Sequence, residues 1–144
     1  MRGPAPAREG SILLDTCALI WLSNGDPISE AAREAIAGAA RQGGVLASPV
    51  SAWEVGLLAE RGEARFLPDP EAWFARLMTA PGIAPAPLDW RITLAASSLP
   101  EHFPGDVADR LLFATARLLA VPFLTRDARL IAYAGAGGLE VIAC

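Results

Sequence analysis

Four acidic residues of this 144-residue chain stand inside apolar stretches, where a carboxylate is uncommon. They are Asp15 in ILLDTC, Glu54 in SAWEVG, Asp109 in VADRLL and Asp127 in FLTRDA. Carboxylates that gather near one another repel, and they stay partly protonated unless a cation neutralises them. An all-oxygen set of this kind suits a hard cation such as Mg²⁺ or Mn²⁺ rather than zinc. Because such ions serve phosphoryl chemistry, the pattern indicates a metal-assisted phosphodiesterase or phosphatase.

Helix capping is the alternative explanation for each of these acids taken singly. A carboxylate at an N-cap accepts hydrogen bonds from the first free N–H groups of a helix. Ser51 and Glu54 have the S-x-x-E spacing of a capping box. The other capping positions would be Asp15, Asp106 and Asp127 as N-caps, with Asp109 at the third helical position. We assign Asp106 to capping, whereas capping does not explain why the other four acids concentrate in apolar surroundings.

Short β-like runs alternate with helical segments along the chain. Strands are expected over residues 11–14, 45–48 and 121–125, in IAPAPL and in LEVIAC, with amphipathic helices between them. Ser29 and Asp69 are expected as N-caps, and Pro49 as the first residue of a helix. This alternation predicts an α/β fold, a three-layer α/β/α sandwich with a mainly parallel sheet. Residues 11–144 are expected to form the single domain, and residues 1–10 a flexible N-terminal lead-in.

The predicted sheet brings the acids toward one edge. Sites in such sheets form outside the carboxyl ends of the strands, where the strand order reverses. Asp15 follows the first strand directly, and Asp127 lies two residues beyond the strand at 121–125. Glu54 falls in the first turns of the helix after strand 45–48. Asp109 lies near the start of the helix that precedes the 121–125 strand, so it would face the same edge if that helix runs antiparallel to the strand.

Composition excludes several other classes of protein. The chain has no lysine, which rules out a GK[ST] phosphate-binding loop and Schiff-base chemistry. Its single histidine, His102, and the lack of a nucleophile-elbow motif argue against a Ser–His–Asp triad. An aspartyl-phosphate phosphatase or a receiver domain would need a lysine, and the phosphatase also a second aspartate where Cys17 stands. The net charge of −4 argues against a broad nucleic-acid footprint but not against a nuclease whose acids bind metal.

The two cysteines and the hydropathy pattern point to the cytoplasm. Cys17 and Cys144 are far apart in sequence and have neither disulfide-framework nor metal-ligand spacing. Cys17 is expected to be a small buried side chain rather than a nucleophile. No signal-like segment opens the chain, and the apolar runs are too short to span a bilayer. A cytoplasmic protein is therefore expected.

Four motifs, in order and with matching spacing, resemble those of PIN-domain ribonucleases, and most closely the VapC-type toxins of bacterial toxin–antitoxin systems. The motifs are LLDTCALIWL, SPVSAWEVGLL, LPEHFPGDVADRLLFATA and FLTRDARLIAY, and the likeness runs from about residue 11 to the C-terminus. The resemblance implies that Asp15, Glu54, Asp109 and Asp127 hold one or two Mg²⁺ or Mn²⁺ ions. It also implies an endoribonuclease in which a metal-activated water attacks an RNA phosphodiester, leaving a 5′-phosphate and a 3′-hydroxyl.

Further residues take roles from this resemblance. Thr16 would support the cluster from outside the metal ligands, and Asp106 would do so beside Asp109. Arg110 and Arg126 flank the acids and would grip RNA phosphates; the alternative is a surface ion pair with Asp106 or Glu101. The chain departs from the VapC pattern at His102, which lies further upstream than usual, and at Val107, where proline is usual. We therefore expect His102 in an exposed loop, without a catalytic role.

Partners are implied as well. A VapC-like toxin would form a homodimer, and an antitoxin protein would cover its active site. Candidates for the groove that receives an antitoxin helix are Trp21, Trp53 and Leu57, for which ordinary core packing is the alternative. A non-catalytic PIN-fold module that binds RNA or protein, with the acids acting only as caps, is the alternative function.

Overall fold

The structure, a computed structural model, describes residues 9–144, so the predicted lead-in lies almost wholly outside the described residues. Its sheet contains five strands, all parallel, in the order β3-β2-β1-β4-β5. The strands are β1 (Ile12–Leu14), β2 (Val45–Ala47), β3 (Ile83–Pro85), β4 (Phe123–Thr125) and β5 (Val141–Ala143). Each predicted strand is present. The mainly parallel sheet of the prediction is confirmed, and within the described residues it is parallel throughout.

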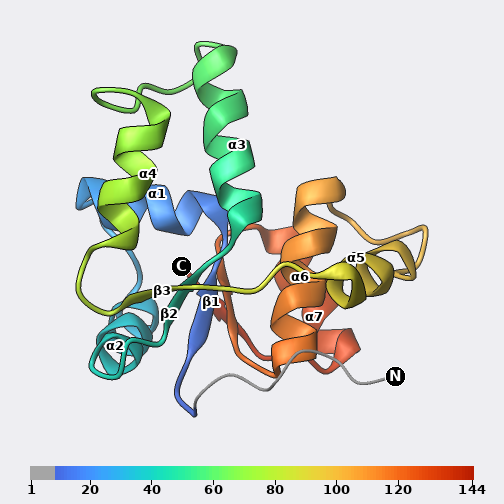
Figure 1. The fold of residues 1–144 in the computed structure, drawn as a ribbon. Helices are drawn as coiled ribbons and strands as arrows, with labels where there is room; N and C mark the ends of the chain where they lie inside the picture. The colour runs from blue at the N-terminus through green and yellow to red at the C-terminus, as the bar shows by residue number, and fades with distance from the viewer. Residues whose placement is uncertain (1–8) are drawn as a thin grey trace.

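Seven helices lie in the described part of the chain and cover both faces of the sheet (Figure 1). They are α1 (Thr16–Asn24), α2 (Glu30–Ala40), α3 (Pro49–Glu60), α4 (Pro70–Met78), α5 (Trp90–Ser97), α6 (Val107–Leu119) and α7 (Ala128–Gly137). The α/β/α sandwich is thereby confirmed. None of the helices in residues 9–144 is both long and apolar enough to cross a membrane.

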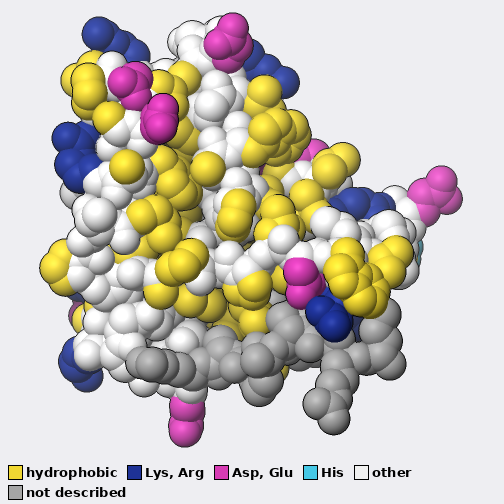
Figure 2. All heavy atoms as spheres, viewed as in Figure 1, with side chains coloured by type: hydrophobic (Ala, Val, Ile, Leu, Met, Phe, Trp, Pro, Cys, Tyr) yellow, Lys and Arg dark blue, Asp and Glu magenta, His cyan; other side chains and the backbone are white. Residues whose placement is uncertain are grey.

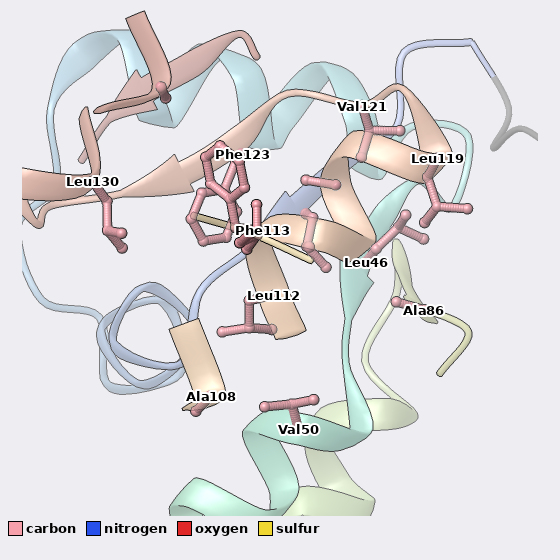
Figure 3. Close-up of a cluster of buried hydrophobic side chains, with 14 of the residues drawn as sticks. Leu46, Val50, Ala86, Ala108, Leu112, Phe113, Leu119, Val121, Phe123 and Leu130 are labelled. Atoms are coloured by element: carbon pink, nitrogen blue, oxygen red, sulfur yellow. The ribbon is translucent and has the colours of Figure 1, made fainter. Parts of the chain in front are cut away.

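Side chains alternate between the two faces of each strand, and each face has its own core. Leu13 of β1 and Phe123 of β4 point toward α6 and α7, where they join Leu112 and Phe113. Figure 3 shows this cluster, with Phe113 and Phe123 at its centre. The alternate strand residues, such as Leu14, pack instead against α1, α2, α3 and α4. The central strands β1, β2 and β4 are buried throughout, which explains why they read as apolar runs rather than alternating ones. The edge strands β3 and β5 are partly exposed.

The helix starts follow the predicted capping chemistry, with one exception. Ser29 and Asp69 cap α2 and α4 as predicted, and Pro49 is the first residue of α3. The capping box assigned to Ser51 and Glu54 is wrong, because Ser48 caps α3 and accepts a hydrogen bond from the Val50 N–H at 3.0 Å. Proline suits the first helical position, so Pro49 places the cap at Ser48, three residues before the predicted one, and Ser51 lies buried inside the helix.

The strand order reverses beside β1, and this places the site. From β1 the chain moves to β2 and β3 on one side, then returns to β4 and β5 on the other. Loops after β1 and β4 therefore diverge and leave room at the carboxyl edge of the sheet. The first turns of α3 and α6 lie at this same edge, and α3 and α4 project side by side beyond it (Figure 1).

Candidate active site

The side chain of Asp15, which follows β1, is held by two other elements, α1 and β4. It caps α1, and its Oδ1 accepts a hydrogen bond from the Ala18 N–H at 2.8 Å. Its Oδ2 accepts one from the hydroxyl of Thr125, at the end of β4, at 2.6 Å. Burial raises the pKa of Asp15, although the bonds from Thr125 and Ala18 act in the opposite direction. Asp15 therefore caps a helix, as the capping explanation predicted, and it also lies at the carboxyl edge of the sheet, held in one orientation by these bonds.

Glu54 reaches the same edge from the second turn of α3. Its Oε1 accepts a hydrogen bond from the hydroxyl of Thr16, whose oxygen also lies 2.9 Å from that of Ser51. Thr16 and Ser51 are both buried, so this hydroxyl pair fixes α3 against α1. Burial raises the pKa of Glu54, and the charges of Asp106 and Asp15 add to the rise. Thr16 thus contacts one of the four acids, and its supporting role stays a prediction. Ser51 was predicted only as a capping partner of Glu54, not as a partner of Thr16.

Asp109 lies in the first turn of α6, near Glu54. Asp106 caps this helix: its Oδ1 accepts from the Asp109 N–H at 2.9 Å, and Asp109 Oδ2 accepts from the Asp106 N–H at 3.1 Å. Asp106 and Asp109 thus form a reciprocal capping box. Burial, together with the charges of Asp106 and Glu54, raises the pKa of Asp109 to about 7. Gly105 is needed here, because a Cβ at that position would lie 2.4 Å from Cβ of Asp109.

Asp127 differs from the other three acids in having a cationic partner. Its Oδ2 lies 2.9 Å from Nη2 of Arg129, and its Oδ1 accepts from Arg129 Nε at 3.3 Å. The hydrogen bonds from Arg129 lower the pKa of Asp127. Asp127 also caps α7 through the Arg129 N–H at 2.9 Å. Sequence reasoning missed Arg129, although an arginine two residues after a capping aspartate lies in the same first turn.

The four carboxylates lie near enough to act on one another. Asp127 contributes to the raised pKa of Asp15, Asp15 to that of Glu54, and Glu54 to that of Asp109. Within residues 9–144, however, no three acidic, histidine or cysteine side chains are arranged as a ready-made metal cage. Glu54, Asp109 and Asp127 each turn toward a donor of this chain instead. The four carboxylates fit a hard divalent cation, because their ligand atoms are all oxygens and most of their negative charge is not compensated by nearby cations. To coordinate an ion together, these side chains would have to rotate toward one another.

The two arginines that flank the acids are held by backbone carbonyls. Arg110 donates to the carbonyls of Leu99 at 3.1 Å and Pro100 at 2.9 Å, and it packs over the ring of Phe103. It makes no ion pair with Asp106 or Glu101, so that alternative is wrong. Arg126 stacks on Trp21, with its guanidinium carbon 3.6 Å from the ring centroid, and donates to two carbonyls.

Arg110→Ala is expected to destabilise the protein by about 1–2 kcal/mol, because the carbonyls of Leu99 and Pro100, just after α5, lose their charged donor and the ring of Phe103 loses its contact with the guanidinium. Chemical denaturation of the variant and the wild type measures this difference. Arg33→Ala, on the exposed part of α2, serves as the control and should change the free energy of unfolding by less than about 0.5 kcal/mol. Equal stabilities of all three proteins would contradict a structural role for Arg110.

His102 and Cys17 are the two further side chains whose positions were predicted from the sequence. His102 is exposed, as predicted, and packs edge-on toward Tyr133 with 6.1 Å between the ring centroids. The prediction that Cys17 is buried is wrong: its residue is exposed in the first turn of α1. Partial desolvation and the charges of Asp15, Glu54 and Asp109 raise the pKa of the Cys17 thiol to about 11. The protonated thiol is a poor nucleophile, so the prediction that Cys17 is not a nucleophile stays in place as a prediction.

The comparison with known proteins decides the family. A sequence model described as the PIN domain matches residues 12–136, the span that contains all four acids. The chain belongs to the PIN-domain family. It is 32% identical over 124 residues to Ribonuclease VapC22 of Mycobacterium tuberculosis, an alignment that covers 83% of this chain and 89% of that relative. The resemblance to PIN-domain proteins of the VapC type is thereby confirmed.

Solved structures share the fold of this PIN-domain chain. A chain of the VapBC2 complex of Rickettsia felis, solved with a promoter DNA fragment, superposes with a TM-score of 0.67 at 11% identity. A chain of a toxin–antitoxin complex from Klebsiella pneumoniae superposes with a TM-score of 0.62 at 22% identity. Each match covers 92% of this chain and 97% of the solved chain. At these identities the likeness concerns the fold alone.

Proposed function

We propose that this PIN-domain protein is a metal-dependent endoribonuclease and the toxin of a type II toxin–antitoxin pair. The observation that carries the proposal is the placement of Asp15, Glu54, Asp109 and Asp127 at one edge of the sheet, at the reversal point beside β1. Three of these carboxylates lack a cationic partner in the described structure, and burial disfavours their ionised form. A relative that shares a third of the sequence is named a ribonuclease, which supports RNA as the substrate.

The carboxylates would hold one or two Mg²⁺ or Mn²⁺ ions, with roles divided among the surrounding residues. A bound ion of this kind supplies an activated water and neutralises charge on the phosphodiester. Thr125 and the Ala18 N–H hold Asp15 in one orientation, and Thr16 does the same for Glu54. Asp106 orients Asp109 through the capping box. Arg126 and Arg110, at the edges of the site, are proposed contacts for RNA phosphates.

An antitoxin is the proposed protein partner, and a homodimer in the cytoplasm the proposed state of the toxin. The solved proteins of the same fold are toxin–antitoxin complexes, which supports a partner of that type. Large hydrophobic side chains are exposed at Trp53, Leu67, Trp90, Leu94 and Val107, and such surfaces are suited to a partner. Trp21 and Leu57 are half-buried, Trp21 beneath Arg126, so Trp53 is the most accessible of the three predicted groove residues.

Cleavage of single-stranded RNA by the purified protein tests the proposed function. Cleavage is expected with Mg²⁺ or Mn²⁺, it should stop on addition of EDTA, and the products should carry 5′-phosphates. RNA binding without metal-dependent cleavage would instead favour the non-catalytic binding module. Cleavage that persists in EDTA would contradict the role of the carboxylates.

Arg129→Gln is expected to raise the affinity for Mn²⁺ roughly two- to five-fold, the effect of removing an exposed ion pair. The reason is competition, since Arg129 occupies both oxygens of Asp127. The rise of the melting temperature with Mn²⁺ concentration, measured without RNA, gives the affinity. Arg41→Gln makes the same charge change at the end of α2, near the opposite edge of the sheet, and should leave the affinity unchanged. A weaker Mn²⁺ response in Arg129→Gln would show that Arg129 supports the site rather than competing for Asp127.

A further inference from the structure

A groove of about 260 Å³ opens directly beside the carboxylates, between α3 and the start of α6. Its lining includes Trp53, Glu54 and Leu57 from α3, Arg61 at the C-cap of that helix, and Asp106 and Val107 from the other side. We call it the α3–α6 groove. Figure 2 shows hydrophobic side chains gathered between these two helices. Glu54 belongs both to the groove and to the carboxylate group, so the two are continuous.

Trp53 is the most conspicuous side chain of this groove. It is 54% exposed, and Val107 opposite it is 65% exposed, although neither caps a helix or fills the core. Exposing a tryptophan ring forgoes the hydrophobic stabilisation that burial would provide. The ring lies one residue before Glu54 on α3, so it stands at the side of the site rather than on a remote surface. A flat, accessible aromatic face beside a phosphate-cleaving centre is suited to stacking against a nucleobase.

Charge along the groove fits a nucleic-acid strand that leaves the carboxylates. Arg61 follows Glu54 by seven residues, which is about 10 Å along the axis of α3. Its exposed guanidinium is available to a phosphate beyond the one at the cleavage centre. Asp106 also lines the groove, on the α6 side, where its capping box with Asp109 places it at the carboxylate end. The rest of the lining is apolar, with Leu57 and Val107 beside Trp53. Along the groove, the proposed phosphate-cleaving carboxylates are therefore followed by an aromatic and apolar stretch and then by a basic residue.

We propose that the α3–α6 groove binds one unpaired nucleobase of the RNA substrate, the base adjacent to the scissile phosphate, stacked on Trp53. The inference rests on the proposed function, because it places the scissile phosphate at the carboxylates. A base held in a duplex cannot present its face to Trp53, so the groove selects single-stranded RNA at the cleavage site. Trp53 is then a residue that determines substrate choice and touches the base rather than the reacting atoms.

Binding of a labelled single-stranded RNA to Trp53 variants in EDTA, where the proposed cleavage is blocked, tests the inference. Trp53→Ala is expected to weaken binding roughly 5- to 150-fold, the range for loss of one base–aromatic stack, and Trp53→Phe to restore most of it. Trp90→Ala is a matched control, because Trp90 is also 54% exposed but lies at the start of α5, outside the groove. The control should bind RNA as the wild type does. Melting temperatures of all three variants show whether they are folded.

Abasic RNA separates stacking from a general effect on the surface. The cleavage site is first mapped with the wild type, and oligonucleotides are then made with an abasic position on either side of it. One of the two should bind the wild type as weakly as intact RNA binds Trp53→Ala, and it should lose nothing further in that variant. If Trp53→Ala binds intact RNA as well as Trp90→Ala does, the groove is not an RNA subsite, and a protein partner becomes its occupant. If Trp53→Ala weakens intact and abasic RNA equally, stacking is refuted.

Failure of the inference and failure of the proposed function give different results. A wild type that cleaves RNA with metal, together with a Trp53→Ala variant of unchanged binding, overturns the base subsite alone. A wild type that neither binds nor cleaves RNA overturns both.

Discussion

Cleavage of RNA is expected to fall at least roughly 10²–10³-fold when Asp15 is replaced by asparagine, the scale seen when a group that stabilises transition-state charge is removed. Asparagine has the shape of aspartate and keeps one acceptor oxygen, so it retains either the bond from the Ala18 N–H or the one from Thr125. What it loses is the negative charge at the centre of the carboxylate group. Asp15 is the acid whose charge is felt by Glu54 and by the Cys17 thiol, and it is influenced in turn by Asp127.

Asp69→Asn is the matched control for this variant. Asp69 caps α4 through a bond from the Ala72 N–H at 2.8 Å, the same distance at which Asp15 accepts from Ala18. The control therefore has the same chemical change at the same type of cap, away from the carboxylate group, and it should cleave RNA at the wild-type rate. Single-turnover cleavage at saturating Mn²⁺ gives the comparison. Equal loss of activity in both variants would mean that capping, and not metal binding, is what the aspartates supply.

The sheet edge could be predicted from sequence because strand ends and helix starts are local signals. Asp15 and Asp127 come directly after, or two residues after, apolar runs that parallel strands require, and the structure places them there. The start of α6 could be predicted for the same reason, since the Asp106 and Asp109 pair is a sequence-local capping box. The error at Ser51 was also local: Pro49 already indicated the earlier cap at Ser48.

Contacts between distant segments could not be predicted in this way. Thr125 is fully buried and bonds to Asp15 across 110 positions, which depends on β1 and β4 being neighbours in the sheet. The sequence did not predict that Arg110 donates to the carbonyls of Leu99 and Pro100, which follow α5, rather than to Asp106 or Glu101. The direction in which a long side chain such as Arg110 extends depends on the neighbouring segments that pack against it. Contacts of this kind are therefore determined by the tertiary structure and not by the local sequence.

Asp109→Asn is expected to lower RNA cleavage on the same scale as Asp15→Asn and, in the absence of metal, to stabilise the protein above pH 7. The folded state raises the pKa of Asp109 to about 7 from an ordinary value of 3.8. Between these two values the unfolded chain is ionised while the folded chain holds the proton, so the stability of the wild type falls as the pH rises. Above about pH 7 the ionised carboxylate carries its full cost, which asparagine removes.

The gain for Asp109→Asn is expected to be about 1–2 kcal/mol at pH 8, well below what the pKa shift alone would give, because solvent screens this half-buried group. It corresponds to roughly 3–7 °C in melting temperature and should vanish below about pH 3, where both states are protonated. Adding Mn²⁺ at pH 8 should make the wild type the more stable of the two proteins. The ion stabilises the wild type by binding to it, whereas the variant lacks one of the carboxylates that would hold the ion. The capping bond from Asp106 survives in the variant through the amide oxygen of asparagine. A variant that is less stable than the wild type at pH 8 without metal would show that Asp109 serves the helix, whereas a crossover on adding Mn²⁺ ties its raised pKa to a site built for a cation.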